Sequence, residues 1–374
     1  MSPVAASSDP ASPDNRLSIL SDLSLPPALS FKCAVIDSKG PRRTMEDAHS
    51  IVAPFAGVRG QGFFAIFDGH AGKQAAEWCG HNFAQCLLNV LRKDPTANIP
   101  DVLNQCFHEA DSSLSKMSEA SDGKMHSGCT VVTAFLRLES PDGTQSFLPP
   151  GFDPLVPPED DEDDGTGRVS PSDSKKSGRS RFKNALRSLG DVGGRRASQY
   201  DDDANASANS NAYTPSVSAP IRRVLYCANA GDARGVLCRA GKAVRLTYDH
   251  KGSDKQEAKR IMDAGGFVMS GRVNGVLAVT RSLGDSSMKE FVVGAPYTTE
   301  TELSEEDEFL ILACDGLWDV VEDQAAVDLV RTLLEPKKAA EELLEHAYKN
   351  YSTDNMTVLV VRFRNPPEST SASQ

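Results

Sequence analysis

Three common signals are missing from this sequence, and each absence excludes a class of protein. The eight cysteines include no C-x-x-C pair, so a zinc site with cysteine ligands is not expected. No run of about 18 apolar residues occurs, so neither a membrane span nor a membrane partner is expected. The first residues lack the charged-then-apolar pattern of a secretion signal. We therefore expect a protein of the cytoplasm, the nucleus or both, with reduced cysteines buried as small apolar residues.

Positive charge is also in short supply. The chain has 40 Lys and Arg residues against 52 Asp and Glu residues, which gives a net charge of −12. A negative protein repels polyanions, so nucleic acid is not an expected partner. A bound metal ion inverts the local field, however, so an anionic substrate remains compatible with this charge.

Composition predicts one folded domain with unstructured additions. Residues 1–30 are rich in Ser, Pro, Ala and Asp and predict a disordered tail, and residues 365–374 predict a second one. Residues 140–220 combine Ser, Pro, Gly and Asn with charged runs and lack an apolar period, which predicts a disordered insertion. Residues 31–364 otherwise form a single predicted domain, which we expect to be a monomer.

The periodic segments predict about nine strands and five helices. The expected helices cover residues 71–91, 99–117, 252–265, 322–335 and 336–350. Ser253 is the expected N-cap of the third helix, and residues 271–283 are expected to form a strand pair. The strands come mostly as hairpin-like neighbours, which favours an α+β fold. The predicted architecture is an α-β-β-α sandwich of two antiparallel sheets flanked by helices.

Four strand-like segments have a carboxylate at one end. They are Phe63–Phe67 before Asp68, Leu225–Ala230 before Gly231-Asp232, Phe309–Cys314 before Asp315, and Met356–Phe363 after Asp354-Asn355. Each acid taken alone is most simply a solvated or salt-bridged turn residue, and we expect a turn at Gly69. The repetition of the pattern predicts instead that the acids share one cleft.

Several carboxylates in one cleft stay ionised only when positive charge lies among them. Oxygen ligands without Cys or His select Mg2+ or Mn2+, and two such ions about 4 Å apart activate water for attack on phosphorus. Arginine suits the phosphate, with Arg42 and Arg43 as candidates. A histidine suits protonation of the leaving oxygen, with His49, His70 and His250 as candidates. These residues predict a metal-dependent phosphate ester hydrolase.

Eight motifs in this order resemble those of the metal-dependent protein serine/threonine phosphatases of type 2C. They are Arg42…Met45-Glu46-Asp47, Phe67-Asp68-Gly69-His70-Ala71-Gly72, Ser127-Gly128-Cys129-Thr130, Asn229-Ala230-Gly231-Asp232-Ala233-Arg234, Asp249-His250, Arg281-Ser282-Leu283-Gly284-Asp285, Leu312-Ala313-Cys314-Asp315-Gly316-Leu317-Trp318-Asp319 and Asp354-Asn355-Met356-Thr357. The similarity runs from about Phe31 to Phe363 except for the insertion. Fungal members that antagonise stress kinases are the most similar.

The resemblance implies a metal-binding role for five matched residues. Asp68 would bridge two Mg2+ or Mn2+ ions, with Glu46 and the Gly69 carbonyl completing one site and Asp315 and Asp354 the other. Some members hold a third, weaker ion, for which the resemblance implies Asp232 and Asp319 together with Asp315.

It also implies roles around the ions. Asp47 would support metal-bound water, Arg42 would bind the substrate phosphate, and His70 would be the general acid. Thr130 and Asn355 would support the ligands, and residues 252–279 would form a flap beside the cleft. Two departures are Cys129, where many members have Ser, and Gly252, where Pro is common.

The implied function is hydrolysis of phosphoserine and phosphothreonine in phosphoprotein substrates. Components of stress or MAP kinase pathways are the expected substrates, whose dephosphorylation would dampen kinase signalling. One alternative is a pseudophosphatase that docks a kinase or a receptor, but it predicts gaps among the acids and the sequence shows none. A phosphatase of small metabolites with the same chemistry is the other alternative.

Overall fold

The computed structural model describes residues 18–21, 25, 29–122, 124–154, 212–216 and 220–364. The elements below belong to the unit formed by residues 1–155 and 213–374. Among these described residues, no helix is both long and apolar enough to cross a bilayer.

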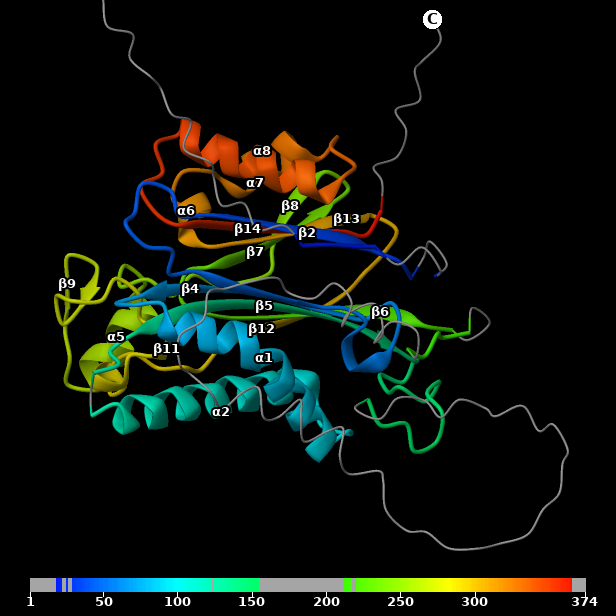
Figure 1. The fold of residues 1–374 in the computed structure, drawn as a ribbon, viewed down its shortest axis with the longest axis horizontal. Coiled ribbons are helices and arrows are strands. Elements are labelled where there is room, and N and C mark those ends of the chain that lie inside the picture. Colours follow the sequence, from blue (N-terminus) through cyan, green and yellow to red (C-terminus); the bar gives the residue numbers. More distant parts are fainter. Residues whose placement is uncertain are drawn as a thin grey trace, which may run out of the picture. The chain divides into compact units, whose positions relative to one another are not determined.

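Two antiparallel sheets form the centre of the fold (Figure 1). The first has the order β1 (Ser18–Ser21), β2 (Lys32–Ser38), β14 (Met356–Arg362), β13 (Asp307–Ala313), β7 (Arg234–Arg239) and β8 (Lys242–Arg245). The second has the order β12 (Tyr297–Glu302), β6 (Arg222–Ala230), β5 (Gly128–Glu139), β4 (Gly62–His70) and β3 (Ala48–Val52), and β11 (Leu283–Gly284) also pairs with β5.

Helices cover the outer face of each sheet (Figure 1). The helices α1 (Gln74–Lys93) and α2 (Ile99–Ala120) lie on the second sheet, and α6 (Asp315–Trp318), α7 (Asp323–Val330) and α8 (Pro336–Lys349) lie on the first. The flap contains α5 (Lys255–Asp263), β9 (Val268–Met269) and β10 (Arg272–Val273), and two short 3-10 turns cover Phe55–Gly57 and Ser286–Met288. The predicted α-β-β-α sandwich is confirmed.

The continuous apolar run of β4 reflects burial on both of its faces. Phe63, Ala65 and Phe67 pack in the core beneath α1 and α2, whereas Phe64 and Ile66 pack in the core between the two sheets. A strand covered on both sides needs apolar residues at every position, which removes the usual alternation. All eight cysteines are free and all except Cys86 are fully buried, as expected.

Several local predictions for the flap and its flanks are wrong. Asp254, not Ser253, caps α5 by accepting hydrogen bonds from the backbone N–H groups of Gln256 and Glu257. The strand pair expected at 271–283 does not form, because β10 pairs with β9 while β11 pairs with β5. Strand β12 was not predicted because its sequence, Tyr-Thr-Thr-Glu-Thr-Glu, is polar and lies at a sheet edge.

The predicted insertion has an ordered base. Phe147, Phe152 and Tyr213 pack together against Val58 and Leu138, and the Tyr213 hydroxyl donates a 2.9 Å hydrogen bond to the Phe147 carbonyl. The expectation of disorder across 140–220 is therefore wrong at both ends, where aromatic side chains separated by some 60 residues of sequence meet. The rest of the insertion, residues 155–211 and 217–219, lies outside the described residues.

The insertion leaves the sheet far from the acid-bearing strand ends. Glu139 at the end of β5 pairs with Arg222 at the start of β6, so the two ends of the insertion are neighbours in one ladder. Asp68 pairs with Thr130 at the other end of β5, nine residues away, or roughly 30 Å of strand. The predicted tail at 1–30 also needs a correction, because Ser18–Ser21 pairs antiparallel with β2.

Candidate metal centre

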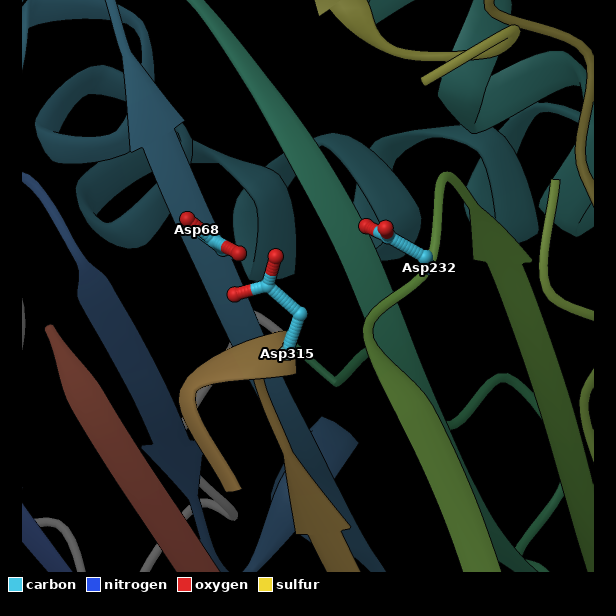
Figure 2. Close-up of side chains that lie close together, drawn as sticks. All are labelled: Asp68, Asp232 and Asp315. Atoms are coloured by element: carbon cyan, nitrogen blue, oxygen red, sulfur yellow. The ribbon is translucent and has the colours of Figure 1, made fainter. Parts of the chain in front are cut away.

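Three of the predicted ligands meet at one edge of the two facing sheets. Asp68 lies near the end of β4, Asp232 lies between β6 and β7, and Asp315 begins α6 directly after β13. One carboxylate oxygen from each lies within 4.8 Å of the others. Figure 2 shows Asp68 and Asp315 turned toward one another, with the Asp232 carboxylate turned toward this pair. The structure therefore brings these three predicted acids together.

The glycines that follow Asp68 and Asp315 permit close backbone approach. A Cβ atom on Gly69 would lie 2.2 Å from the Glu46 carbonyl oxygen, and one on Gly316 would lie 1.9 Å from the Asn355 carbonyl oxygen. Neither glycine requires a positive φ, and β4 continues through Gly69 to His70, so the predicted turn at Gly69 is wrong. These Asp-Gly pairs bring the segments carrying Glu46 and Asn355 against the centre.

Asp47 and Asp354 extend this group of acids. The Asp47 Oδ2 accepts a 2.7 Å hydrogen bond from the Thr357 hydroxyl, while its buried Oδ1 has no partner. Burial, and secondarily the charge of Asp354, raise the pKa of Asp47 to about 6. Asp354 also raises the pKa values of Asp68 and Asp315, so it lies close enough to belong to the same electrostatic cluster.

The cluster is electrostatically unbalanced. Burial raises the pKa of Asp68 well above its usual value, and the charges of Asp315, Asp47, Asp232 and Asp354 add to that increase. Burial and neighbouring carboxylates raise the pKa of Asp315 in the same way. Such a group is stable in its ionised form only beside added positive charge.

Glu46 and Asn355 join the loop before β3 to the centre. The Glu46 carboxylate accepts hydrogen bonds from the Thr44 hydroxyl at 3.0 Å and the Gly72 N–H at 3.2 Å. The Asn355 Oδ1 accepts from the Glu46 N–H at 2.8 Å, and its Nδ2 donates to the carbonyls of Lys39 and Thr44. Asn355 therefore holds the backbone that carries Glu46.

Thr130 packs against Gly231, the residue that precedes Asp232. Its hydroxyl is buried without a hydrogen-bond partner, and its Cβ would lie 2.4 Å from a Cβ placed on Gly231. Gly231 has a φ of +111°, so both conformation and space require glycine beside Asp232.

Arg42 is linked to the acid cluster by an ion pair with Asp354. Its Nη2 is 2.5 Å from the Asp354 Oδ2, and its Nε donates to the Thr353 carbonyl at 3.3 Å. The Arg42 side chain is 56% exposed, so its remaining N–H groups are available to a ligand that enters from solvent.

His70 has a partner that the sequence did not identify. Its Nε2 lies 2.7 Å from the Oδ2 of buried Asp285, which also accepts a hydrogen bond from Ser282. A Cβ on Gly128 would lie 2.1 Å from that same Asp285 oxygen, so glycine is needed there. The motif containing Asp285 was visible in the sequence, but its contact with His70 depends on the pairing of β11 with β5.

The other two histidines lie in different surroundings. His250 is buried, its ring contacts the Gly231 backbone, and burial together with the Arg281 charge lowers its pKa to about 4. His49 lies within β3 opposite Ile66. His70, which is partly exposed and follows Asp68 and Gly69 at the end of β4, is thus the histidine adjacent to the acids.

Asp319 was predicted as a ligand beside Asp232, and the structure joins the two through a lysine. The Lys251 Nζ lies 2.9 Å from the Asp319 Oδ1 and 3.5 Å from the Asp232 Oδ2. Lys251 was not predicted to lie at the site, although it directly follows the Asp249-His250 motif.

The donor set fits Mg2+ or Mn2+. All the clustered side chains offer hard oxygen atoms, and Asp47 and Asp232 each keep one buried carboxylate oxygen without a hydrogen-bond partner. Divalent ions bound here would neutralise the cluster and activate water for attack on phosphorus.

Comparison with known proteins agrees with this geometry. The sequence matches the family model Protein phosphatase 2C over residues 31–140 and 170–356. Protein phosphatase 2C homolog 1 of Saccharomyces cerevisiae is 37% identical over 349 residues, which cover 93% of this chain and 99% of the yeast protein. The protein of the same name from Schizosaccharomyces pombe is 39% identical over 327 residues, covering 87% of this chain and 71% of that protein.

A solved structure, that of serine-threonine phosphatase 2C from Toxoplasma gondii, shares the fold. It has a TM-score of 0.60 at 19% identity and covers 94% of this chain and 99% of the other. The resemblance predicted from the motifs is confirmed. The chain belongs to the protein phosphatase 2C family, the Mg2+- or Mn2+-dependent protein serine/threonine phosphatases that act on phosphoproteins.

Proposed function

We propose that this chain hydrolyses phosphoserine and phosphothreonine in phosphoproteins with two Mg2+ or Mn2+ ions held by the acid cluster. The observation that carries this proposal is the group of buried or half-buried carboxylates with raised pKa values and unpartnered oxygens. Asp68, Asp315, Asp354 and Glu46 would hold the two ions together with the Gly69 carbonyl, and Asp47 would orient a bound water.

The chain's own polar groups would bind the phosphate and move the proton. Arg42 is partly exposed beside Asp354 and can donate to phosphate oxygens through N–H groups that Asp354 does not use. His70 would give its proton to the serine or threonine oxygen that leaves, while Asp285 keeps the ring in place. The partial exposure of both residues agrees with a site that opens to a large substrate.

A direct test measures phosphate release from a phosphoserine peptide with Mn2+, with Mg2+ and with EDTA. Turnover should require the metal, and Asp68→Asn and Asp315→Asn should abolish it while Mn2+ no longer raises the melting temperature. Metal-independent turnover, or normal rates in both variants, would refute the proposed centre.

The role of His70 is tested by changing the leaving group. Nitrophenolate leaves without a proton, whereas a serine alkoxide needs one, so His70→Asn should slow the phosphopeptide reaction much more than nitrophenyl phosphate hydrolysis. Equal losses of rate on both substrates would show that His70 does not protonate the leaving group.

We further propose that the enzyme acts as a monomer in the cytoplasm, the nucleus or both, and dampens a stress or MAP kinase pathway. The two yeast relatives span most of this chain, which supports a shared role. Phosphoproteins retained by an inactive Asp68 variant in cell extract should include kinases of such a pathway. Retention of unrelated phosphoproteins alone would contradict this assignment.

A further inference from the structure

A lysine occupies the space between two of the acids predicted to hold a third ion. The Lys251 ammonium lies 2.9 Å from the Asp319 Oδ1 and 3.5 Å from the Asp232 Oδ2, and the lysine side chain is only 35% exposed. Asp249 also contributes negative charge at this lysine. The ammonium thus supplies the positive charge that these carboxylates need when no metal ion lies between them.

Asp232 retains capacity for a further cation. The residue is 5% exposed, and its Oδ1 is buried with no hydrogen-bond partner, although Lys251 contacts its Oδ2. The opposite partner, Asp319, is 59% exposed at its side chain and lies at the end of α6, four residues after Asp315. One buried acid and one exposed acid therefore flank a single lysine ammonium.

Lys251 also lies at the root of the flap. Its backbone forms an antiparallel bridge with Val279 at the other end of the flap, and its carbonyl accepts a 2.9 Å hydrogen bond from the Asp254 N–H that precedes α5. The contact between its side chain and Asp319 ties the flap root to α6. Loss of that contact removes a side-chain link between the flap and the element that carries Asp315.

We propose that the Lys251 ammonium and a third divalent cation compete for Asp232 and Asp319, so that occupancy by the ion releases the flap root. The inference deepens the proposed function, since it presumes that the acid cluster binds metal. A divalent ion and an ammonium cannot share two carboxylates at these distances without strong repulsion. The lysine therefore lowers the affinity of the site for the third ion. The concentration of free Mg2+ or Mn2+ then controls how often the Lys251–Asp319 ion pair links the flap root to α6.

The test compares wild type with Lys251→Met and Lys251→Arg. Bound Mn2+ is counted by the electron paramagnetic resonance signal of free Mn2+, and hydrogen exchange of residues 252–279 is measured at low and high Mn2+. Met keeps the length of the stem without the charge, whereas Arg keeps the charge. Melting temperatures in EDTA show that both variants are folded.

In Lys251→Met the third Mn2+ should bind at least tenfold more tightly than in wild type, and in Lys251→Arg its affinity should stay within threefold. High Mn2+ should speed amide exchange of the flap root in wild type, and in the Met variant exchange should be fast already at low Mn2+. Asp319→Asn should weaken the third ion in every background. An unchanged or weaker third ion in the Met variant overturns the proposal.

The same titration separates this inference from the proposed function. Two tightly bound ions and metal-dependent phosphate release in wild type uphold the two-ion centre, whatever happens at Lys251. If two ions bind but Lys251→Met leaves the third affinity unchanged, only the competition fails. If wild type binds no Mn2+ tightly and releases no phosphate, the proposed function itself fails.

Discussion

Two buried carboxylates in this protein, Glu257 and Asp47, have pKa values that move in opposite directions. Burial alone would raise the pKa of Glu257, but hydrogen bonds and charge from Arg281, Arg260 and Thr280 lower it to about 2. Burial raises the pKa of Asp47 to about 6, although a hydrogen bond from the neutral Thr357 hydroxyl opposes the increase.

The difference shows where the chain supplies its own positive charge. Glu257 joins α5 to the segment after the flap through Arg281 and also pairs with Arg260 on α5, so its ionised form stabilises the fold. Among the described residues, two cationic side chains pair with acids of the Asp68 cluster. Arg42 pairs with Asp354 and Lys251 pairs with Asp232, and both lie at the margin of the cluster. The centre of that cluster therefore suits cations from solution, at a cost in stability when they are absent.

The largest expected effect comes from removing Asp68, the carboxylate proposed to bridge the two ions. Asp68→Asn should lower phosphopeptide turnover by at least about 1000-fold, because the ions would lose a shared ligand. In EDTA the same variant should be as stable as wild type or more stable, because one repelling charge is gone. Activity assays and urea unfolding measure both quantities.

The matched control for Asp68→Asn is Asp263→Asn, an exposed acid paired with Lys259 on α5. This control should change neither activity nor unfolding free energy by a measurable amount. A large loss of stability in EDTA for Asp68→Asn would contradict the electrostatic account of the cluster.

Glu257→Gln should show the opposite behaviour. Removing this charge leaves Arg281 and Arg260 without their carboxylate, so the free energy of unfolding should fall by about 3 kcal/mol in the presence or absence of metal. Urea unfolding in EDTA and in Mn2+ measures the loss. A fall in the free energy of unfolding of less than about 1 kcal/mol would mean that the charge of Glu257 does not stabilise the fold.

His250 lies between the two regions, near Arg281 and against Gly231, and should make stability depend on pH. Its folded pKa of about 4 lies below the ordinary 6.5, so the unfolded chain binds the proton more tightly and stability falls as pH drops from 6.5 toward 4. Between pH 7 and pH 5, wild type should lose about 2 kcal/mol more than His250→Asn. Parallel pH profiles for the two proteins would show that His250 is not buried in its neutral form.

The smallest effect is expected at the insertion. Deleting residues 156–211 keeps the packing of Phe147 and Phe152 on Tyr213, so the melting temperature should change by less than about 2 °C. Deleting 140–220 removes that packing and should lower it clearly more. Equal effects of the two deletions would show that the aromatic base contributes no stability.

The sequence predicted that Asp68, Asp232 and Asp315 come together because each lies at or near the end of a continuous apolar run. Runs such as Phe63–Phe67 and Phe309–Cys314 predict buried strands, and their ends determine where Asp68 and Asp315 lie. The sandwich followed from strands arranged as neighbours rather than alternating with helices. These signals are local, so short windows of sequence contain them.

The partners of these residues were not predictable in the same way. Lys251 meets Asp319 across 68 positions and His70 meets Asp285 across 215, so only the folded chain brings them together. Ser253 and Asp254 are both competent N-caps, and sequence spacing alone did not distinguish them. Strand β12 forms because β6 offers it a partner, although its own residues carry no apolar pattern.

The pairing of Glu139 with Arg222 has a consequence for how this enzyme can diversify. Since Glu139 and Arg222 are paired in one ladder, the two ends of the insertion lie side by side, whatever chain connects them. The entropic penalty of closing a longer connection grows only with the logarithm of its length. A lineage, or a protein engineer, can therefore graft a sensor module at this hairpin and leave the chemistry at the opposite rim untouched.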